Sequence, residues 1–110
     1  MTCRHRDTFF VAGIAERRGK FDGIYLGERR RGKLVYAGKV EHGFTDAQAR
    51  HLKALAARFT TTRQPIAADR TFPKAQWLTP RLRAEVEYRR KTTSGLLRHP
   101  SYKGLREDLD

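Results

Sequence analysis

The sequence is short of cysteine, of long apolar runs and of acidic residues, and each shortage excludes a class of protein. The single cysteine, Cys3, cannot form an intramolecular disulfide, which excludes a disulfide-stabilised fold and favours a reducing compartment. No apolar run approaches the ~20 residues that cross a bilayer, and no apolar stretch follows the N-terminal charges as in a signal peptide. We therefore expect a cytoplasmic protein without a membrane partner.

The charge is strongly one-sided, because 12 Asp and Glu residues stand against 24 Lys and Arg residues, for a formal net charge of +12 at pH 7. In a small domain this excess favours a polyanionic partner, with nucleic acid as the leading candidate. The alternative is a basic surface without a specific partner. The 110 residues suffice for one domain with one modest core, and exclude most self-sufficient multi-domain enzymes.

The first 44 residues predict three strands in a meander, at residues 7–14, 21–28 and 34–42, separated by glycine-containing basic turns. We expect the two turns to be neighbours and to concentrate positive charge at the hairpin tips. Three basic clusters favour binding to a phosphate backbone, since such contacts need point charges, whereas the alternative is a solvated face. The clusters are Arg17, Arg18 and Lys20; Arg29, Arg30, Arg31 and Lys33; and Arg89, Arg90 and Lys91.

A single helix is expected after the third strand, where Thr45 and Gln48 form a capping box before an apolar stripe that runs to Phe59. Residues 60–74 contain two prolines and lack periodicity, which predicts a loop. Strands are expected again at 75–79 and 83–91, with a last segment at 96–106. Five strands with one α-helix between strands 3 and 4 is the order of the mainly β, five-stranded oligonucleotide-binding (OB) barrel.

Four aromatic residues bear on the kind of nucleic acid. We expect them to share the side of the core aliphatics, which favours contact with the backbone of a duplex over stacking on single-stranded bases. They are Tyr25, Tyr36, Trp77 and Tyr88.

Catalytic and metal-binding motifs are weak. Lys20-Phe-Asp-Gly23 matches the motif of the adenylated lysine in nucleotidyltransferases, but between two strand patterns it is better interpreted as the shoulder of a hairpin. The four histidines and Cys3 lack the spacing of zinc ligands, so no metal site is predicted. Glu85 and Glu87 alternate with basic residues, as cross-strand charge partners do.

The C-terminal half contains Val86-Glu-Tyr88 and then Leu97-Arg-His-Pro-Ser-Tyr-Lys-Gly-Leu-Arg-Glu-Asp108, in which an Arg-x-Pro element is followed by an Arg-x-Asp element. These stretches resemble the end of a bacterial ATP-dependent DNA ligase of the non-homologous end-joining type, where the two elements form motif VI. Upstream stretches are similar to the same domain: Phe10-Val-Ala-Gly13, Phe21-Asp-Gly-Ile-Tyr-Leu-Gly27, Tyr36-Ala-Gly-Lys-Val40, Gly43-Phe-Thr-Asp46 and Trp77. The match divides the chain into an N-terminal extension at 1–7 and an OB-fold domain at 8–108.

The resemblance implies that the domain swings between two orientations. In one, the accessory catalytic residues of motif VI (Arg98, Pro100, Arg106 and Asp108) face the nucleotide and orient the pyrophosphate leaving group during enzyme adenylation. In the other, a different face closes over nicked duplex DNA in strand-break repair. Leu109 stands where the family has a lysine, so we expect a smaller contribution from the motif.

The resemblance also implies the partners. ATP and Mg²⁺ would serve a complete ligase, this domain alone would bind no cofactor, and the adenylation domain would act in cis or in trans. We expect a monomer, bacterial and nucleoid-associated, that is inactive alone because it lacks the adenylation domain. Two alternatives stay open: a free-standing OB-fold module that binds nucleic acid without catalysis, and a ribosomal-type RNA-binding protein.

Overall fold

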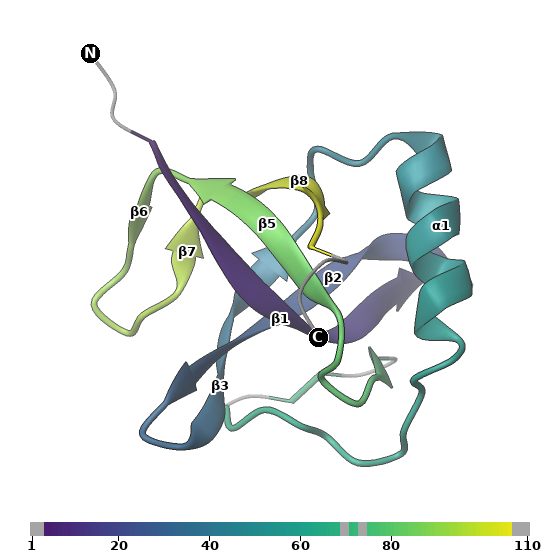
Figure 1. Ribbon diagram of the computed structural model, residues 1–110, viewed down its shortest axis with the longest axis horizontal. Helices are drawn as coiled ribbons and strands as arrows, with labels where there is room; N and C mark the ends of the chain where they lie inside the picture. The colour runs from purple at the N-terminus through teal and green to yellow at the C-terminus, as the bar shows by residue number, and fades with distance from the viewer. Residues whose placement is uncertain (1–3, 69–70, 73–74, 107–110) are drawn as a thin grey trace.

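The computed structural model describes residues 4–68, 71–72 and 75–106, which form eight strands and one helix (Figure 1). The main antiparallel sheet has the order β3-β2-β1-β5-β8, with β4 paired to β1 off this path, and β6 pairs only with β7. Within the described ranges, no helix is long and apolar enough to cross a membrane. In chain order the elements are β1 (His5–Arg17), β2 (Lys20–Arg30), β3 (Lys33–Val40), α1 (Asp46–Ala56), β4 (Ala75–Trp77), β5 (Arg83–Tyr88), β6 (Arg90–Lys91), β7 (Leu97–Arg98) and β8 (Ser101–Leu105).

The predicted meander of β1, β2 and β3 is confirmed; β1 and β2 are longer than expected, and β3 ends at Val40, before the predicted residue 42. Both turns hold two residues with positive φ, an arginine followed by a glycine: Arg18 (53°) and Gly19 (75°), then Arg31 (50°) and Gly32 (79°). Two consecutive positive φ angles define the type I′ turn, whose twist matches that of paired strands. At its other end, β1 begins at His5, which is opposite Tyr88, so the sheet starts inside the predicted N-terminal extension.

The helix α1 lies between β3 and β4, as predicted, and its capping box is present. The hydroxyl of Thr45 accepts the backbone N–H of Gln48 at 3.1 Å, and the side chain of Gln48 accepts the N–H of Thr45 at 3.1 Å. Leu52 and Ala56 are buried against the sheet. The helix ends at Ala56, one turn before the predicted Phe59, ahead of the β-branched run at 60–62.

The mainly β class with one helix is confirmed, but the described residues form eight strands rather than five. Two predicted segments are each divided in two. Residues 83–91 bend at Arg89 into β5 and β6, and residues 96–106 break where His99 has φ of 52° before Pro100, which lacks a backbone N–H. The edge strands β3 and β8 approach at one parallel bridge, His42 to Ser101, so no continuous ladder closes a barrel.

The sheet carries apolar side chains on both faces. Its inner face forms the core with α1, built on Ile14, Ile24, Leu26, Leu52 and Val86, all of them inaccessible to solvent. The outer face carries an aromatic cluster, in which ring centroids lie 4.9–6.3 Å apart. Its members are Tyr25, Tyr36, Phe72 and Trp77.

This cluster corrects the expectation that Tyr25, Tyr36 and Trp77 share the side of the core aliphatics. Tyr25 alternates with the buried Ile24 and Leu26, so it must point to the other face. Tyr36 changes side relative to Val40 because the register shifts at Ala37, as in a β-bulge. Tyr88 does lie in the core, at 6% exposure.

The predicted loop at 60–74 covers part of this outer face. Ala67 lies beside β3, where its N–H donates to the carbonyl of Leu34 at 2.9 Å and its carbonyl accepts from Tyr36 at 3.0 Å. Ile66 is buried against Gly27, and Phe72 contributes a ring to the aromatic cluster. The described residues of this segment, 60–68 and 71–72, therefore cover part of the outer face of the sheet.

Candidate nucleic-acid interface

The two hairpin tips are not neighbours, which corrects the sequence-based expectation. Arg17, Arg18 and Lys20 form the β1–β2 tip, whereas the cluster of residues 29–33 lies at the β2–β3 tip, at the other end of β2 (Figure 1). Because β2 has 11 residues and a strand rises about 3.3 Å per residue, the tips are separated by about 30 Å. Consecutive turns of an antiparallel meander always fall at opposite ends of the shared strand.

The β2–β3 tip instead lies beside the third basic cluster, on the β6–β7 hairpin. Glu28 joins the two, since its carboxylate lies 2.9 Å from Lys91 Nζ and 3.8 Å from Arg30 Nη2. Arg90 is paired in register with Arg98, so the motif VI arginine belongs to the same hairpin. We call this set the joint basic surface; all of its members are exposed, and they are Arg30, Arg31, Lys33, Arg89, Arg90, Lys91 and Arg98.

The two arginines of motif VI are not brought together. Arg98 lies before β8 and Arg106 follows it, so they stand at opposite ends of that strand. Arg106 Nη1 lies 3.9 Å from Oε1 of Glu85, whose Oε2 lies 3.1 Å from Arg6 Nη2. Asp108, the expected partner of Arg106, lies outside the described residues.

The cross-strand role predicted for Glu85 and Glu87 is confirmed. Glu87 Oε1 lies 3.1 Å from Arg4 Nε, and Glu85 pairs with Arg6 as described above. Sequence reasoning missed these partners, Arg6 on β1 and Arg4 just before it, because the pairing of β1 with β5 joins residues about 80 positions apart.

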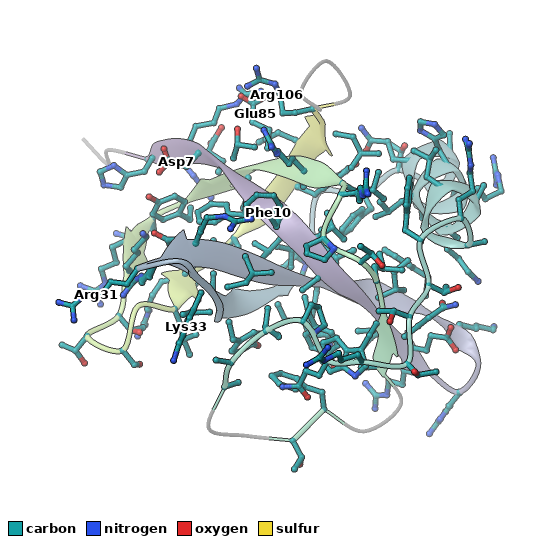
Figure 2. The ribbon with its side chains drawn as sticks, turned by 60° about the horizontal axis from the view of Figure 1, so that its bottom comes forward. Asp7, Phe10, Arg31, Lys33, Glu85 and Arg106 are labelled. Carbon is teal, nitrogen blue, oxygen red and sulfur yellow. The ribbon has the colours of Figure 1, made fainter. Side chains whose placement is uncertain are left out.

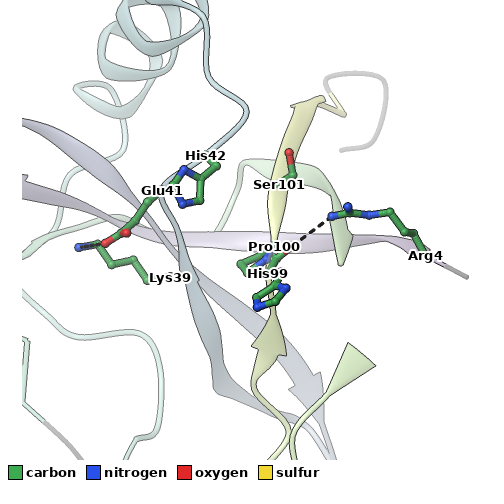
Figure 3. Close-up of a pocket in the computed structure, with 7 residues that line it drawn as sticks. All are labelled: Arg4, Lys39, Glu41, His42, His99, Pro100 and Ser101. Atoms are coloured by element: carbon green, nitrogen blue, oxygen red, sulfur yellow. Dashed lines mark hydrogen bonds and ion pairs between the residues drawn. The ribbon is translucent and has the colours of Figure 1, made fainter. Parts of the chain in front are cut away.

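A cavity of about 500 Å³ lies between the end of β3 and the β7–β8 connection (Figure 3). Pro100 of motif VI lines it, together with Arg4, whose Nη2 donates to the carbonyl of His99 at 3.3 Å. On the opposite wall, Lys39 Nζ lies 2.7 Å from Asp22 and 2.8 Å from Glu41. Burial opposes the charge of Lys39, but these two carboxylates raise its pKa above the ordinary value. The cations of the cavity are therefore already paired with carboxylates, and it offers little surplus charge to an anion.

The Lys20-Phe-Asp-Gly23 segment forms the shoulder of the β1–β2 hairpin, as predicted. Lys20 is exposed at the tip, and Asp22 is paired with Lys39. Gly23 has φ of 131°, and a Cβ there would collide with the carbonyl oxygen of Val40. The Asp-Gly pair is thus explained by strand packing.

Metal ligation has no support in the part of the chain that the structure describes, where no three His, Cys, Asp or Glu side chains lie together. Cys3 lies outside this part. His5 packs against Tyr88, with ring centroids 5.4 Å apart.

One partly buried hydrogen bond connects the N-terminal end of β1 to β5. The hydroxyl of Tyr88 donates to Oδ2 of Asp7 at 2.6 Å. Burial, assisted by the Asp7 carboxylate, raises the pKa of Tyr88 to about 12. Because Asp7 lies on β1 and Tyr88 on β5, the bond connects the two strands beside the joint basic surface.

Known proteins match this chain over most of its length. A family described as the ATP dependent DNA ligase C terminal region matches residues 17–109. The multifunctional non-homologous end joining protein LigD of Pseudomonas aeruginosa is 30% identical over 118 residues, covering 98% of this chain and 14% of that protein. LigD of Mycolicibacterium smegmatis is 36% identical over 78 residues, covering 68% of this chain and 10% of that protein.

Solved structures agree with these sequence matches. The crystal structure of the ligase domain from M. tuberculosis LigD superimposes with a TM-score of 0.88 at 27% identity, covering 96% of this chain and 36% of that one. A mycobacterial DNA ligase D complexed with ATP and MES gives a TM-score of 0.83, covering 94% of this chain and 35% of that one. The chain thus corresponds to a small part of longer proteins.

Proposed function

This chain belongs to the family of C-terminal regions of ATP-dependent DNA ligases, of the non-homologous end-joining type, and we propose that it is the DNA-engaging domain of such a ligase. In this role it closes over nicked duplex DNA and supplies motif VI to an adenylation domain, in cis or in trans. The site of action is the bacterial cytoplasm, at the DNA. The free-standing module is not favoured, because the relatives extend far beyond the matched region.

The fold that we propose for this domain is an OB-type barrel in an incompletely paired form. The sheet order β3-β2-β1-β5-β8 supports it, because β1 lies between β2 and β5 as the first strand of that barrel does. The parallel bridge between His42 and Ser101 stands where β3 and β8 would close the ring. The short strands β4, β6 and β7 would then be additions to the five strands of the barrel.

The joint basic surface is the observation that carries DNA binding. The surface has seven exposed cations from two hairpins, and two of them, Arg30 and Lys91, lie near the carboxylate of Glu28, so a large positive excess is retained. Arginine and lysine bind phosphate oxygens without reading bases, which suits an enzyme that must act at any sequence. The β1–β2 tip, about 30 Å away along β2, adds a second and separate contact.

In adenylation, the function of Arg98 and Arg106 is to donate charged hydrogen bonds to phosphate oxygens of the nucleotide. ATP would supply the adenylyl group, and the residues of this chain would stabilise negative charge on the phosphates that depart. Mg²⁺ would be bound outside this domain, since the described residues offer no cluster of carboxylates. Because Arg98 and Arg106 stand at opposite ends of β8, we propose that they contact different phosphates or act in different steps.

A comparison of two substrates tests this proposal. The chain is combined with an adenylation domain of a LigD-type ligase, in one polypeptide or by mixing, and we call the product the reconstituted ligase. We expect Arg106→Ala to slow ATP-driven sealing by on the order of 10²-fold, less than a full motif would give because of Leu109, while sealing of pre-adenylated nicks survives. Arg98→Ala is expected to slow ATP-driven sealing as well, with a smaller loss on pre-adenylated nicks, because Arg98 also belongs to the joint basic surface.

Arg50→Ala is the matched control, because Arg50 is an exposed arginine on α1 that belongs neither to the joint basic surface nor to the β1–β2 tip cluster. Equal losses on both substrates for Arg98→Ala and Arg106→Ala would contradict the motif VI role and show that these residues bind DNA or support the fold.

A further inference from the structure

The outer face of the main sheet has a covered half and an open half. The covered half lies under the aromatic cluster, where Trp77 packs directly on Gly13. The open half is centred on Phe10, which is only partly buried and alternates with the buried Phe9 and Val11. Phe10 therefore presents its ring on the outside of the sheet, beyond the edge of the aromatic cluster.

Two arginines place their guanidinium carbons over this ring, from the two strands that flank β1. The guanidinium carbon of Arg29, from β2, lies 5.3 Å from the ring centroid, and that of Arg83, from β5, lies 5.1 Å from it. A guanidinium that stacks on an aromatic ring uses its planar face and keeps its N–H groups at the edges, in a fixed plane. Such an arrangement pre-orients donors that match phosphate oxygens.

Arg106 lies on the same face, next to this stack. Its backbone N–H donates to the carbonyl of Arg83 at 2.8 Å, and its side chain approaches Glu85, two residues further along β5. Figure 2 shows Phe10 between Arg106 and Glu85 on one side and Arg31 and Lys33 of the hairpin tip on the other. Glu85 is paired with Arg6 of β1, and Glu87 is paired with Arg4, which precedes β1, so these two carboxylates already have cationic partners.

We propose that Arg29 and Arg83, stacked on Phe10, form a phosphate-binding element that contacts the triphosphate of the nucleotide during enzyme adenylation. This inference rests on the proposed function, because the face that carries Arg106 is the one turned to the nucleotide in that step. The element extends the motif VI contact across β5, β1 and β2, in a row of neighbouring strands about 4.8 Å apart. A row of this length suits a chain of phosphates rather than one isolated anion.

The reconstituted ligase tests the inference with the same two substrates. Arg83→Ala is expected to slow ATP-driven sealing by about 10-fold to 100-fold, the loss of one charge-assisted hydrogen bond, and to leave sealing of pre-adenylated nicks unchanged. Arg83→Lys should recover part of the rate, and Phe10→Leu, which removes the aromatic face but keeps an apolar side chain, should give a smaller loss of the same kind. Arg50→Ala is again the control.

Two results would overturn the inference. Slower sealing of both substrates by Arg83→Ala would show that Arg83 contacts DNA, and unchanged sealing of both would show that its contact with Phe10 is structural. In both cases the proposed function would stand if Arg106→Ala still slowed ATP-driven sealing alone. A titration of the chain alone with inorganic triphosphate gives an independent readout by nuclear magnetic resonance. We expect the side-chain N–H signals of Arg29 and Arg83 to shift and Arg83→Ala to weaken binding at least several-fold relative to Arg50→Ala; triphosphate that leaves both signals unmoved would also reject the inference.

Discussion

At the scale of single residues, the environment of a side chain decides what its type can do. Lys20 lies two residues before Asp22 in the sequence, and Lys39 lies beside Asp22 in the folded structure. Of these two lysines, Lys39 has carboxylate partners, Asp22 at 2.7 Å and Glu41 at 2.8 Å. Lys20 extends from an exposed tip. A nucleophilic lysine needs a lowered pKa and an enclosed nucleotide, and an exposed hairpin supplies neither.

Lys20→Ala therefore leaves enzyme adenylation intact. In the reconstituted ligase we expect transfer of labelled AMP at the rate of the unmodified protein, with DNA affinity reduced at most modestly by the loss of one charge. If AMP transfer disappeared while circular dichroism showed the fold retained, the interpretation of Lys20-Phe-Asp-Gly23 as a hairpin shoulder would be wrong.

The bond between Tyr88 and Asp7 makes stability depend on alkaline pH. Since folding raises the pKa of Tyr88 from 10 to about 12, the folded state favours the protonated phenol. The stabilisation is complete below pH 10 and is lost as the pH rises from 10 to 12, by about 2–3 kcal/mol at most. Denaturant unfolding should show Tyr88→Phe less stable than the unmodified chain at pH 8, with the difference narrowing toward pH 12. A difference that stays constant over this range contradicts the assignment.

At the scale of elements, local patterns predicted the strands and the helix, while contacts between distant segments could not be predicted. Alternation over a few residues is sufficient to place β1, β2, β3 and β5, and the capping box places the start of α1. The link from Glu28 to Lys91 joins residues 63 positions apart, so no local pattern indicates that two basic hairpins meet. No sequence pattern predicts the register shift at Ala37, which moves Tyr36 to the outer face of the sheet.

The separation of the hairpin tips predicts independent contributions to DNA affinity. The double change Arg31→Ala and Lys33→Ala, in the joint basic surface, should weaken duplex binding more than Arg17→Ala and Arg18→Ala at the β1–β2 tip, where no second hairpin adds charge. The free-energy losses should add when all four changes are combined, because the tips are about 30 Å apart. Fluorescence anisotropy with a nicked duplex measures each affinity. Free-energy losses that depart strongly from additivity would contradict independent contributions and indicate that both tips contact the same part of the DNA.

At the scale of the whole molecule, the distribution of charge favours contact with a phosphate backbone over recognition of bases. The described residues have one helix, and its exposed face carries few cations, so no element is suited to read bases in a major groove. Ten of the 24 lysines and arginines lie in the three basic clusters of the hairpins. Under the proposed function, such a surface would bind the phosphate backbone of DNA, and specificity for nicks would come from the adenylation domain.

This electrostatic account predicts steep salt dependence. The affinity for duplex DNA should fall linearly in a log–log plot, with a slope near −0.9 for each phosphate neutralised and with little difference between sequences. Anisotropy titrations from low to physiological salt on two unrelated duplexes measure both quantities. Affinity that is independent of salt, or a strong preference for one sequence, would disprove backbone recognition.

Nick sealing by a mixture of proteins tests the central claim most directly. An isolated LigD-type adenylation domain is assayed with ATP, Mg²⁺ and a nicked duplex, with and without this chain, and with the chain carrying Arg106→Ala. We predict that the unmodified chain increases ATP-driven sealing at least tenfold, that Arg106→Ala loses most of this increase, and that both chains support sealing of a pre-adenylated nick equally. A chain that binds the duplex but leaves ATP-driven sealing unchanged, even when joined to the adenylation domain in one polypeptide, would contradict the ligase function and favour the binding module.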